Sequence, residues 1–278
     1  MWSWIVSLLN TSLSIWSARL TEIWQIVSMS PQDFMGGSVW NIIVNIHGGL
    51  QAVGYGLLVL FFAMGIFKQA ASFREVRRPE QAFKFLIRFL VARVVITYGM
   101  DIMLTIFEII GGITATVAGN LAAVTTNLTV PPNVVDAIHG TGVFAGMGLL
   151  FISLIGVVAI LVLSLVAVLT VYGRFFRLYI YTAIAPIPLS TFGGEGFSST
   201  GKAFLKSYIG VCLEGAIIVL ACIIYSAIVS NTFVPVDPNA TEAASIALAY
   251  IIQVVFGMLI LVGIIRGADR IVKEMMGL

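Results

Sequence analysis

The stretch that decides the fold runs from Arg174 to Lys206 and reads RFFRLYIYTAIAPIPLSTFGGEGFSSTGKAFLK. Basic residues stand at both ends, and the apolar run over 178–192 between them is interrupted by Pro186 and Pro188. Proline lacks a backbone N–H and clashes with the preceding helical turn, so the run cannot continue as one regular helix. It is also shorter than the roughly 20 helical residues that a bilayer crossing needs. We therefore expect 178–192 to enter the membrane from the side of its basic flanks and to return there.

Such a re-entrant segment makes a demand on the rest of the chain. Non-helical backbone at membrane depth is stable only where protein or water covers it. We therefore expect neighbouring helices to pack around the segment, with Gly193-Gly194 as a flexible turn after it. The predicted re-entrant motif consists of Pro186, Pro188, Gly193 and Gly194.

The composition predicts an all-α polytopic membrane protein. Hydrophobic residues make up 59% of the 278 residues and charged residues only 10%, whereas a soluble domain carries about 25% charged residues. Apolar stretches of sufficient length predict five transmembrane helices, at about 38–67, 89–118, 141–173, 203–231 and 244–265.

Residues 1–37 are predicted to form an extracytoplasmic amphipathic helix and hinge that precede a membrane domain over 38–278. The apolar residues of this helix recur at helical spacing: Leu9, Leu13, Trp16, Leu20, Trp24 and Val27. Tryptophan is favoured at the membrane–water boundary, so the helix could lie on the bilayer surface. The alternative is that it packs on the membrane domain of its own protein.

The distribution of charge predicts the orientation. Of the 15 Lys and Arg residues, all but Arg19 lie in or beside three segments, 68–93, 174–206 and 266–273, and the stretches 119–140 and 232–243 contain none. Because positive loops stay in the cytoplasm, we expect the N-terminus outside and the C-terminus inside. Five basic residues are candidate cytoplasmic anchors or docking points for an ATPase: Arg74, Arg77, Arg78, Arg174 and Arg177.

Three carboxylates, Asp101, Glu108 and Glu214, lie within predicted spans. Carboxylates at membrane depth are costly and normally face protein or a water-filled cavity. They are therefore candidates to line a conduit or to hold helices together during assembly. His47 is expected to be a packed, hydrogen-bonded side chain, with a proton-relay or metal role as the alternative.

The sequence contains no motif that indicates catalysis. A phosphate-binding loop, a nucleophile elbow, an HExxH pair and a Cys/His cluster are all missing from it. We therefore expect a protein that is not an enzyme, that holds no cofactor or metal, and that takes its energy from another protein.

The basic and proline-broken stretch resembles the TrbL-like polytopic inner-membrane component of type IV secretion and conjugation systems. The resemblance rests on Arg174, Arg177, AIAPIPLSTF at 183–192 and GKAFLKSYIGVCLEGAIIVL at 201–220. It is closest to the small versions on Gram-positive conjugative elements, because 119–140 is too short for the large periplasmic domain of many Gram-negative relatives.

The resemblance implies a non-enzymatic channel or scaffold subunit of a conjugative DNA-transfer machine in the bacterial plasma (inner) membrane. Its expected partners are further copies of itself, other secretion subunits including a cytoplasmic ATPase, membrane lipids, and in passing the translocated DNA or protein. In a homo-oligomeric collar, the amphipathic helix would sit on the outer rim. The alternative is a secondary transporter or ion channel that uses the intramembrane carboxylates and His47, although no internal repeat supports a transporter. An intramembrane enzyme is the third hypothesis.

Overall fold

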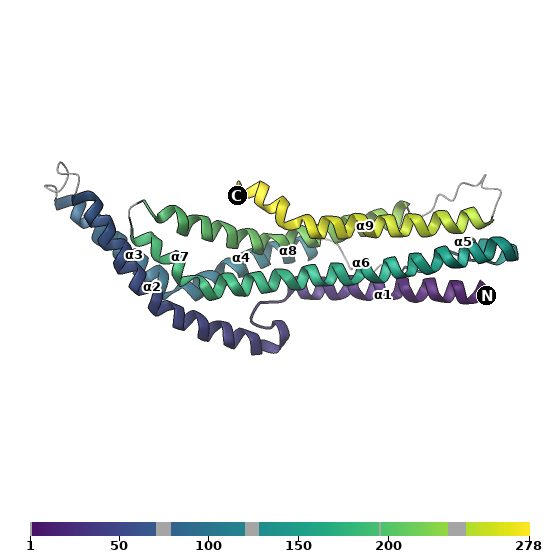
Figure 1. Ribbon diagram of the computed structural model, residues 1–278, viewed down its shortest axis with the longest axis horizontal. Helices are drawn as coiled ribbons and strands as arrows, with labels where there is room; N and C mark the ends of the chain where they lie inside the picture. The colour runs from purple at the N-terminus through teal and green to yellow at the C-terminus, as the bar shows by residue number, and fades with distance from the viewer. Residues whose placement is uncertain (1, 71–78, 120–127, 195, 233–242) are drawn as a thin grey trace. The chain divides into compact units, whose positions relative to one another are not determined.

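The computed structural model describes residues 2–70, 79–119, 128–194, 196–232 and 243–278, and within these ranges it contains helices and no strand (Figure 1). The all-α prediction is thus confirmed. The elements in chain order are α1 (Trp2–Ser28), η1 (Phe34–Gly37), α2 (Ser38–Ala70), α3 (Pro79–Thr97), α4 (Gly99–Gly119), α5 (Pro132–Gly140), α6 (Val143–Ile184), α7 (Pro186–Ser190), η2 (Thr191–Gly193), α8 (Ser198–Thr232) and α9 (Ala243–Met276).

Five of the described helices are long and apolar enough to cross a membrane, as the sequence predicts. They cover Phe34–Phe67, Gly99–Val117, Val143–Ile184, Ser198–Val229 and Ala243–Met276. The chain is therefore a multi-pass membrane protein. The placement of residues 1–37 outside the membrane stays a prediction.

The helix boundaries differ from the predicted spans in several places, and three of these bear on the site. The predicted second span is divided at Tyr98 between α3 and α4. The stretch 119–140 includes a helix, α5, whose first position is Pro132; proline is favoured there because the first turn needs no N–H donor. Helix α6 continues for 42 residues to Ile184, so the predicted re-entrant segment begins inside a helix.

The chain divides into two compact units, each assembled from separate parts of the sequence. Unit 1 consists of Met1–Ser28, Thr114–Gly173 and Ala216–Ala268, and unit 2 consists of Met29–Ile113, Arg174–Gly215 and Asp269–Leu278.

In unit 1, the amphipathic helix α1 packs on its own protein. Its apolar face is buried at Ile5, Leu9, Ser12, Leu13, Trp16, Leu20, Ile23, Ile26 and Val27. The Trp16 indole is fully buried and meets the ring of Tyr225 edge to face, with centroids 6.1 Å apart. The Asn10 side chain accepts a hydrogen bond from the backbone N–H of Val130 at 2.9 Å. Of the two interpretations of this helix, the structure shows the packed one.

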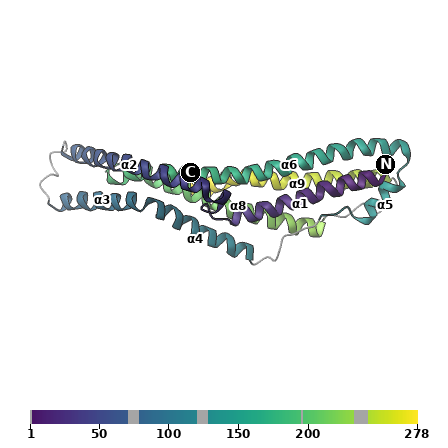
Figure 2. The same cartoon turned by 90° about the horizontal axis from the view of Figure 1, so that it is seen from below.

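In unit 2, the proline-broken segment is covered by helices, as the sequence predicts. After Ile184 the chain enters the short helix α7 and the turn η2, and both pack against α2 and α3. Pro186 and Leu189 are buried. Prolines 186 and 188 lack the N–H groups that would bond to the carbonyls of Thr182 and Ile184, four residues earlier. The Thr182 carbonyl oxygen instead lies 2.7 Å from Nδ1 of His47 on α2. In both views α2 and α3 lie side by side (Figures 1 and 2).

Contact between α2 and α7 is close at Gly54. A Cβ atom at this position would lie 2.8 Å from the carbonyl oxygen of Pro186, which is backbone and cannot swing away. At Gly56, one half-turn further along α2, a Cβ would meet nothing within 4 Å. Alanine substitutions at the two positions therefore distinguish the effect of this contact from the effect of helix propensity.

We predict that Gly54→Ala destabilises the protein by about 1–3 kcal/mol, because overpacking displaces α7. The matched change Gly56→Ala is expected to be neutral or stabilising by up to about 1 kcal/mol, since alanine favours helix. Unfolding by sodium dodecyl sulfate in mild detergent measures both variants. Equal stability of the two variants would show that α7 does not press on α2.

Candidate functional site

Charged side chains from three helices meet in unit 2. We call Arg174 and Arg177 of α6, Glu214 of α8, and Asp269 and Lys273 of α9 the charge cluster. Positions three or four apart lie on one side of a helix. Helix α6 therefore presents two charges on one side, those of Arg174 and Arg177. Helix α9 likewise presents the charges of Asp269 and Lys273 on one side.

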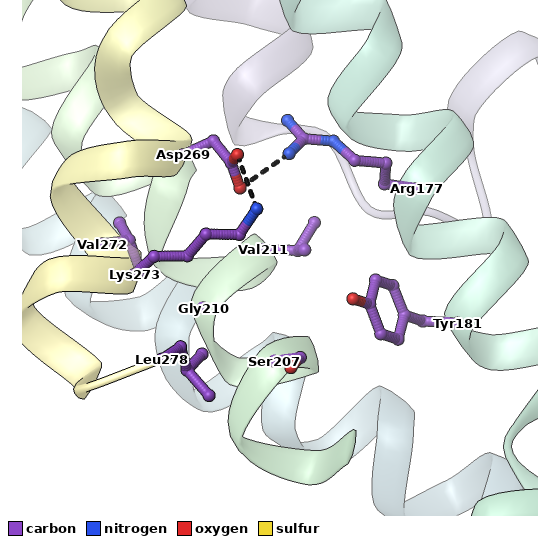
Figure 3. Close-up of a pocket in the computed structure, with 9 residues that line it drawn as sticks. All are labelled: Arg177, Tyr181, Ser207, Gly210, Val211, Asp269, Val272, Lys273 and Leu278. Atoms are coloured by element: carbon purple, nitrogen blue, oxygen red, sulfur yellow. Dashed lines mark hydrogen bonds and ion pairs between the residues drawn. The ribbon is translucent and has the colours of Figure 1, made fainter. Parts of the chain in front are cut away.

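Arg177 lies at the centre of the charge cluster. Its guanidinium donates to the Glu214 carboxylate at 2.5 Å and pairs with Asp269 at 3.0 Å. The Lys273 ammonium in turn donates to the Asp269 carboxylate at 2.9 Å (Figure 3). The Glu214 side chain is only 3% exposed, whereas that of Arg177 is 36% exposed. One arginine thus links a buried acid on α8 to a more exposed acid on α9.

Arg174 is held differently, by backbone and aromatic rings. Its Nε donates to the carbonyl of Val211 and its Nη2 to that of Cys212, both at 3.1 Å. The guanidinium carbon lies 5.9 Å from the centre of the Phe107 ring and 5.6 Å from that of Phe175, within cation–π range. Arg174 is only 2% exposed.

The absence of a side chain at Gly215 makes room for this arginine. A Cβ there would lie 2.6 Å from the guanidinium carbon and from both terminal nitrogens of Arg174. The glycine follows Glu214 directly, so α8 presents an acid and a gap side by side to the two arginines of α6.

A small pocket of about 60 Å³ adjoins the charge cluster (Figure 3). Its lining consists of Arg177, Tyr181, Ser207, Gly210, Val211, Asp269, Val272, Lys273 and Leu278. Small-molecule sites have volumes of roughly 300–1,000 Å³, so this pocket has space for a few waters and not for a substrate.

The charge cluster is suited to holding helices in register. Its partners come from three helices, and removing one partner of a buried ion pair leaves the other without compensation. Four of its five charges, those of Arg177, Glu214, Asp269 and Lys273, each have an opposite charge within 3.0 Å. We infer no bond-making chemistry from this arrangement.

The structure does not bring the three candidate carboxylates together. Glu214 is in the charge cluster, whereas Asp101 and Glu108 lie on α4 and are exposed. Among the described residues, no three His, Cys, Asp or Glu side chains are grouped closely enough to hold a metal ion. His47 is buried, and its Nδ1 lies 2.7 Å from the carbonyl oxygen of Thr182. Its observed contact is thus that of a packed, hydrogen-bonded histidine.

The re-entrant motif and the basic candidates have separate positions. Gly193 and Gly194 are buried beside α2, where Leu58 and Phe61 are their neighbours. The side chain of Arg174 is used inside the fold and is not presented on a surface. The candidates Arg74, Arg77 and Arg78 lie outside the described residues.

Sequence reasoning missed Asp269 and Lys273. Residues after 265 read as a charged tail, but α9 continues to Met276 and carries both residues into the cluster. The signal was present in the spacing, because Asp269–Lys273 and Arg270–Glu274 are both opposite charges four residues apart. Such pairs support a helix.

We predict that Arg177→Met destabilises the protein by about 3 kcal/mol, because it leaves the buried Glu214 without its partner. Adding Glu214→Gln to this variant should restore much of the loss, since the amide carries no charge. The measurement is unfolding by sodium dodecyl sulfate in mild detergent.

The matched control is Arg270→Met, which breaks the exposed Arg270–Glu274 pair of the same helix that carries Asp269. Exposed pairs contribute about 0–1 kcal/mol, so this variant should be close to wild type. Equal losses for Arg177→Met and Arg270→Met, or no recovery with Glu214→Gln, would refute the structural role of the cluster.

The sequence also matches a known protein family. A family model described as TrbL/VirB6 plasmid conjugal transfer like protein matches residues 16–186. No curated protein and no solved structure is detectably similar to the chain. The match includes both arginines of α6 and ends at Pro186, so the rest of the re-entrant motif lies beyond it. Because it covers more than half of the sequence, the chain belongs to the TrbL/VirB6 plasmid conjugal transfer-like family, whose setting is type IV secretion and conjugation.

Proposed function

We propose that the protein is a non-enzymatic channel subunit of a conjugative type IV secretion machine, with several copies arranged around the translocation path. The family match over residues 16–186 carries this proposal. The five apolar helices fit a subunit that forms a membrane wall. Energy for transfer comes from a cytoplasmic ATPase of the same machine, and the protein itself needs no cofactor.

Glu108 supports the proposal of several copies. It lies in the middle of α4, a helix apolar enough to cross a membrane, and it is exposed in the single chain. A carboxylate that faced lipid at this depth would be costly. Contact with a neighbouring copy or with a water-filled path removes that cost. Asp101 lies seven residues earlier, on the same side of the helix and also exposed.

The proposed orientation has the N-terminus outside and the C-terminus in the cytoplasm. It rests on the Lys- and Arg-free stretches 119–140 and 232–243, which alternate with the basic segments. Helix α5 lies in the first of these stretches and is therefore placed on the outer side.

A first prediction tests this orientation by cysteine labelling in intact cells, in a Cys212→Ser, Cys222→Ser background. Asn133→Cys on α5 and Asn239→Cys should react with a membrane-impermeant thiol reagent, and Ser72→Cys and Ser199→Cys should react only after lysis. Residues 72 and 239 lie outside the described residues, whereas Asn133 and Ser199 are exposed. Labelling of Ser199→Cys in sealed cells would mean that the segment over 178–192 crosses the membrane.

A second prediction concerns assembly and transfer. Glu108→Leu should lower the efficiency of conjugative transfer in a complementation assay, whereas Ile109→Leu, at the exposed neighbouring position, should not. Native mass in mild detergent distinguishes the two roles. Loss of the oligomer places Glu108 at a contact between copies, and an intact oligomer with lowered transfer places it on the path.

Contrary results would be equally clear. The proposal is contradicted if the protein is monomeric, if its deletion leaves transfer unchanged and if it conducts ions in liposomes. These three results together would identify a transporter or ion channel. Normal transfer and a normal oligomer for Glu108→Leu would remove the argument from this carboxylate.

A further inference from the structure

Helix α1 lies lengthwise along membrane-spanning helices of unit 1. In both views it runs roughly parallel to α6 and α9 (Figures 1 and 2). At its start, the Trp2 indole occupies the space beside Gly146 of α6. In its middle, Trp16 packs on Tyr225 of α8. A helix lying flat on a bilayer surface would cross the spans and could not follow them in this way.

The other long helices of unit 1 turn apolar side chains outward. The part of α6 in unit 1, residues 143–173, carries no charged residue. Its exposed positions follow one another along the helix as large apolar side chains, among them Phe144, Phe151, Ile155, Val158, Val162, Leu165 and Leu169. In unit 1, α8 and α9 also expose large apolar side chains, including Leu220, Ile224, Ile228, Ile252, Phe256 and Leu259, and the exposed Arg266 stands near the end of this part of α9. These faces are suited to lipid.

The outward face of α1 has the opposite character. Its exposed residues are Ser3, Trp4, Ser7, Thr11, Ser14, Ala18, Arg19, Thr21, Gln25 and Ser28. All but Trp4 and Ala18 are polar. We call this surface the hydroxyl face of α1.

Hydroxyl groups alone would not exclude lipid. Thr11 donates to the carbonyl of Ser7, Ser14 to that of Thr11 and Thr21 to that of Ser17, so these hydroxyls are satisfied within the helix.

The ion pair between Arg19 and Glu22 is a separate observation that points to water. The two side chains meet at 2.5 Å and remain 50% and 30% exposed. Arg19 lies 17 residues after Trp2, which places the pair about 25 Å along the helix at 1.5 Å per residue. Charged groups at membrane depth face a protein interior or a water-filled cavity. These exposed charges therefore point to water, rather than lipid, beside this part of α1.

We infer that the hydroxyl face of α1 lines the outer part of the translocation path. This inference rests on the proposed channel function. It places α1 at membrane depth on the inner side of the collar, in place of the predicted extracytoplasmic helix on the outer rim. The outer position follows from Asn10, which holds Val130 in the stretch assigned to the outside. Arg19 and Glu22 are the only charged residues of α1 and they cancel. A neutral, hydroxyl-rich wall keeps the path wet without retaining a polyanion such as single-stranded DNA.

Cysteine labelling in intact donor cells tests this inference in the Cys212→Ser, Cys222→Ser background. Ser7→Cys, Ser14→Cys and Thr21→Cys of the hydroxyl face should react with an impermeant methanethiosulfonate reagent added outside. The matched controls Phe151→Cys, Val158→Cys and Leu165→Cys replace exposed side chains of α6. These control cysteines should not react, because thiols react as thiolates and lipid excludes both the thiolate and the reagent.

A transfer assay on the same cells then tests the path itself. A bulky thiol reagent on Ser14→Cys should lower conjugative transfer, and the same reagent on Asn133→Cys, which is exposed on α5, should leave transfer unchanged.

Each other outcome overturns the inference. Reaction at the α6 controls would mean that this part of unit 1 stands in water rather than in lipid. No labelling at the three α1 positions would exclude a water-exposed face. An oxidant-induced disulfide between two Ser14→Cys chains would show that a second copy covers this face. Labelling without loss of transfer would place the wet face off the path. In all these cases, normal transfer by unlabelled donors together with its loss on deletion would leave the proposed channel function standing.

Discussion

The guanidinium of Arg174 is almost without contact with solvent, and the carbonyl groups of Val211 and Cys212 take the place of water around it. An arginine cannot lose its proton under ordinary conditions, so its burial fixes the surrounding helices. α8 must present free carbonyl oxygen lone pairs and the gap at Gly215, and the rings of Phe107 and Phe175 must cover the guanidinium faces. Arg177, one turn further along, then reaches Glu214 and Asp269. Helix α6 can thus continue through two arginines to Ile184.

The proline-broken segment imposes a second requirement on unit 2. Pro186 and Pro188 cannot donate to the carbonyls of Thr182 and Ile184, and Nδ1 of His47 on α2 lies 2.7 Å from the Thr182 carbonyl oxygen. The backbone of α7 lies against α2 at Gly54. Helices α2 and α3 therefore cover this segment, as a re-entrant segment in a membrane would need. The result is a short connection between α6 and α8, the two helices that carry Arg174, Arg177 and Glu214 of the charge cluster.

The sequence was sufficient to predict the all-α membrane class and the five apolar helices, because the length of an apolar stretch is a local property of the chain. It was also sufficient for the covered proline segment and for the apolar face of α1. It was insufficient for the ends of α6 and α9. Charges at Arg174, Arg177 and Asp269 looked like membrane boundaries, and only the three-dimensional pairing shows that they are used between helices. The same limit applies to the carboxylates: helical spacing places Asp101 and Glu108 on one face, but no local pattern shows that Glu214 belongs elsewhere.

In the proposed channel subunit, the apolar exposed face of α6 meets lipid and the hydroxyl face of α1 meets water. Imaging of single particles of the full chain in lipid nanodiscs is the most direct measurement of this account. It predicts a closed ring of several copies around an axial opening, with α1 turned toward the axis and the apolar exposed face of α6 toward lipid. Single copies in the nanodiscs, or a ring without an axial opening, would contradict it.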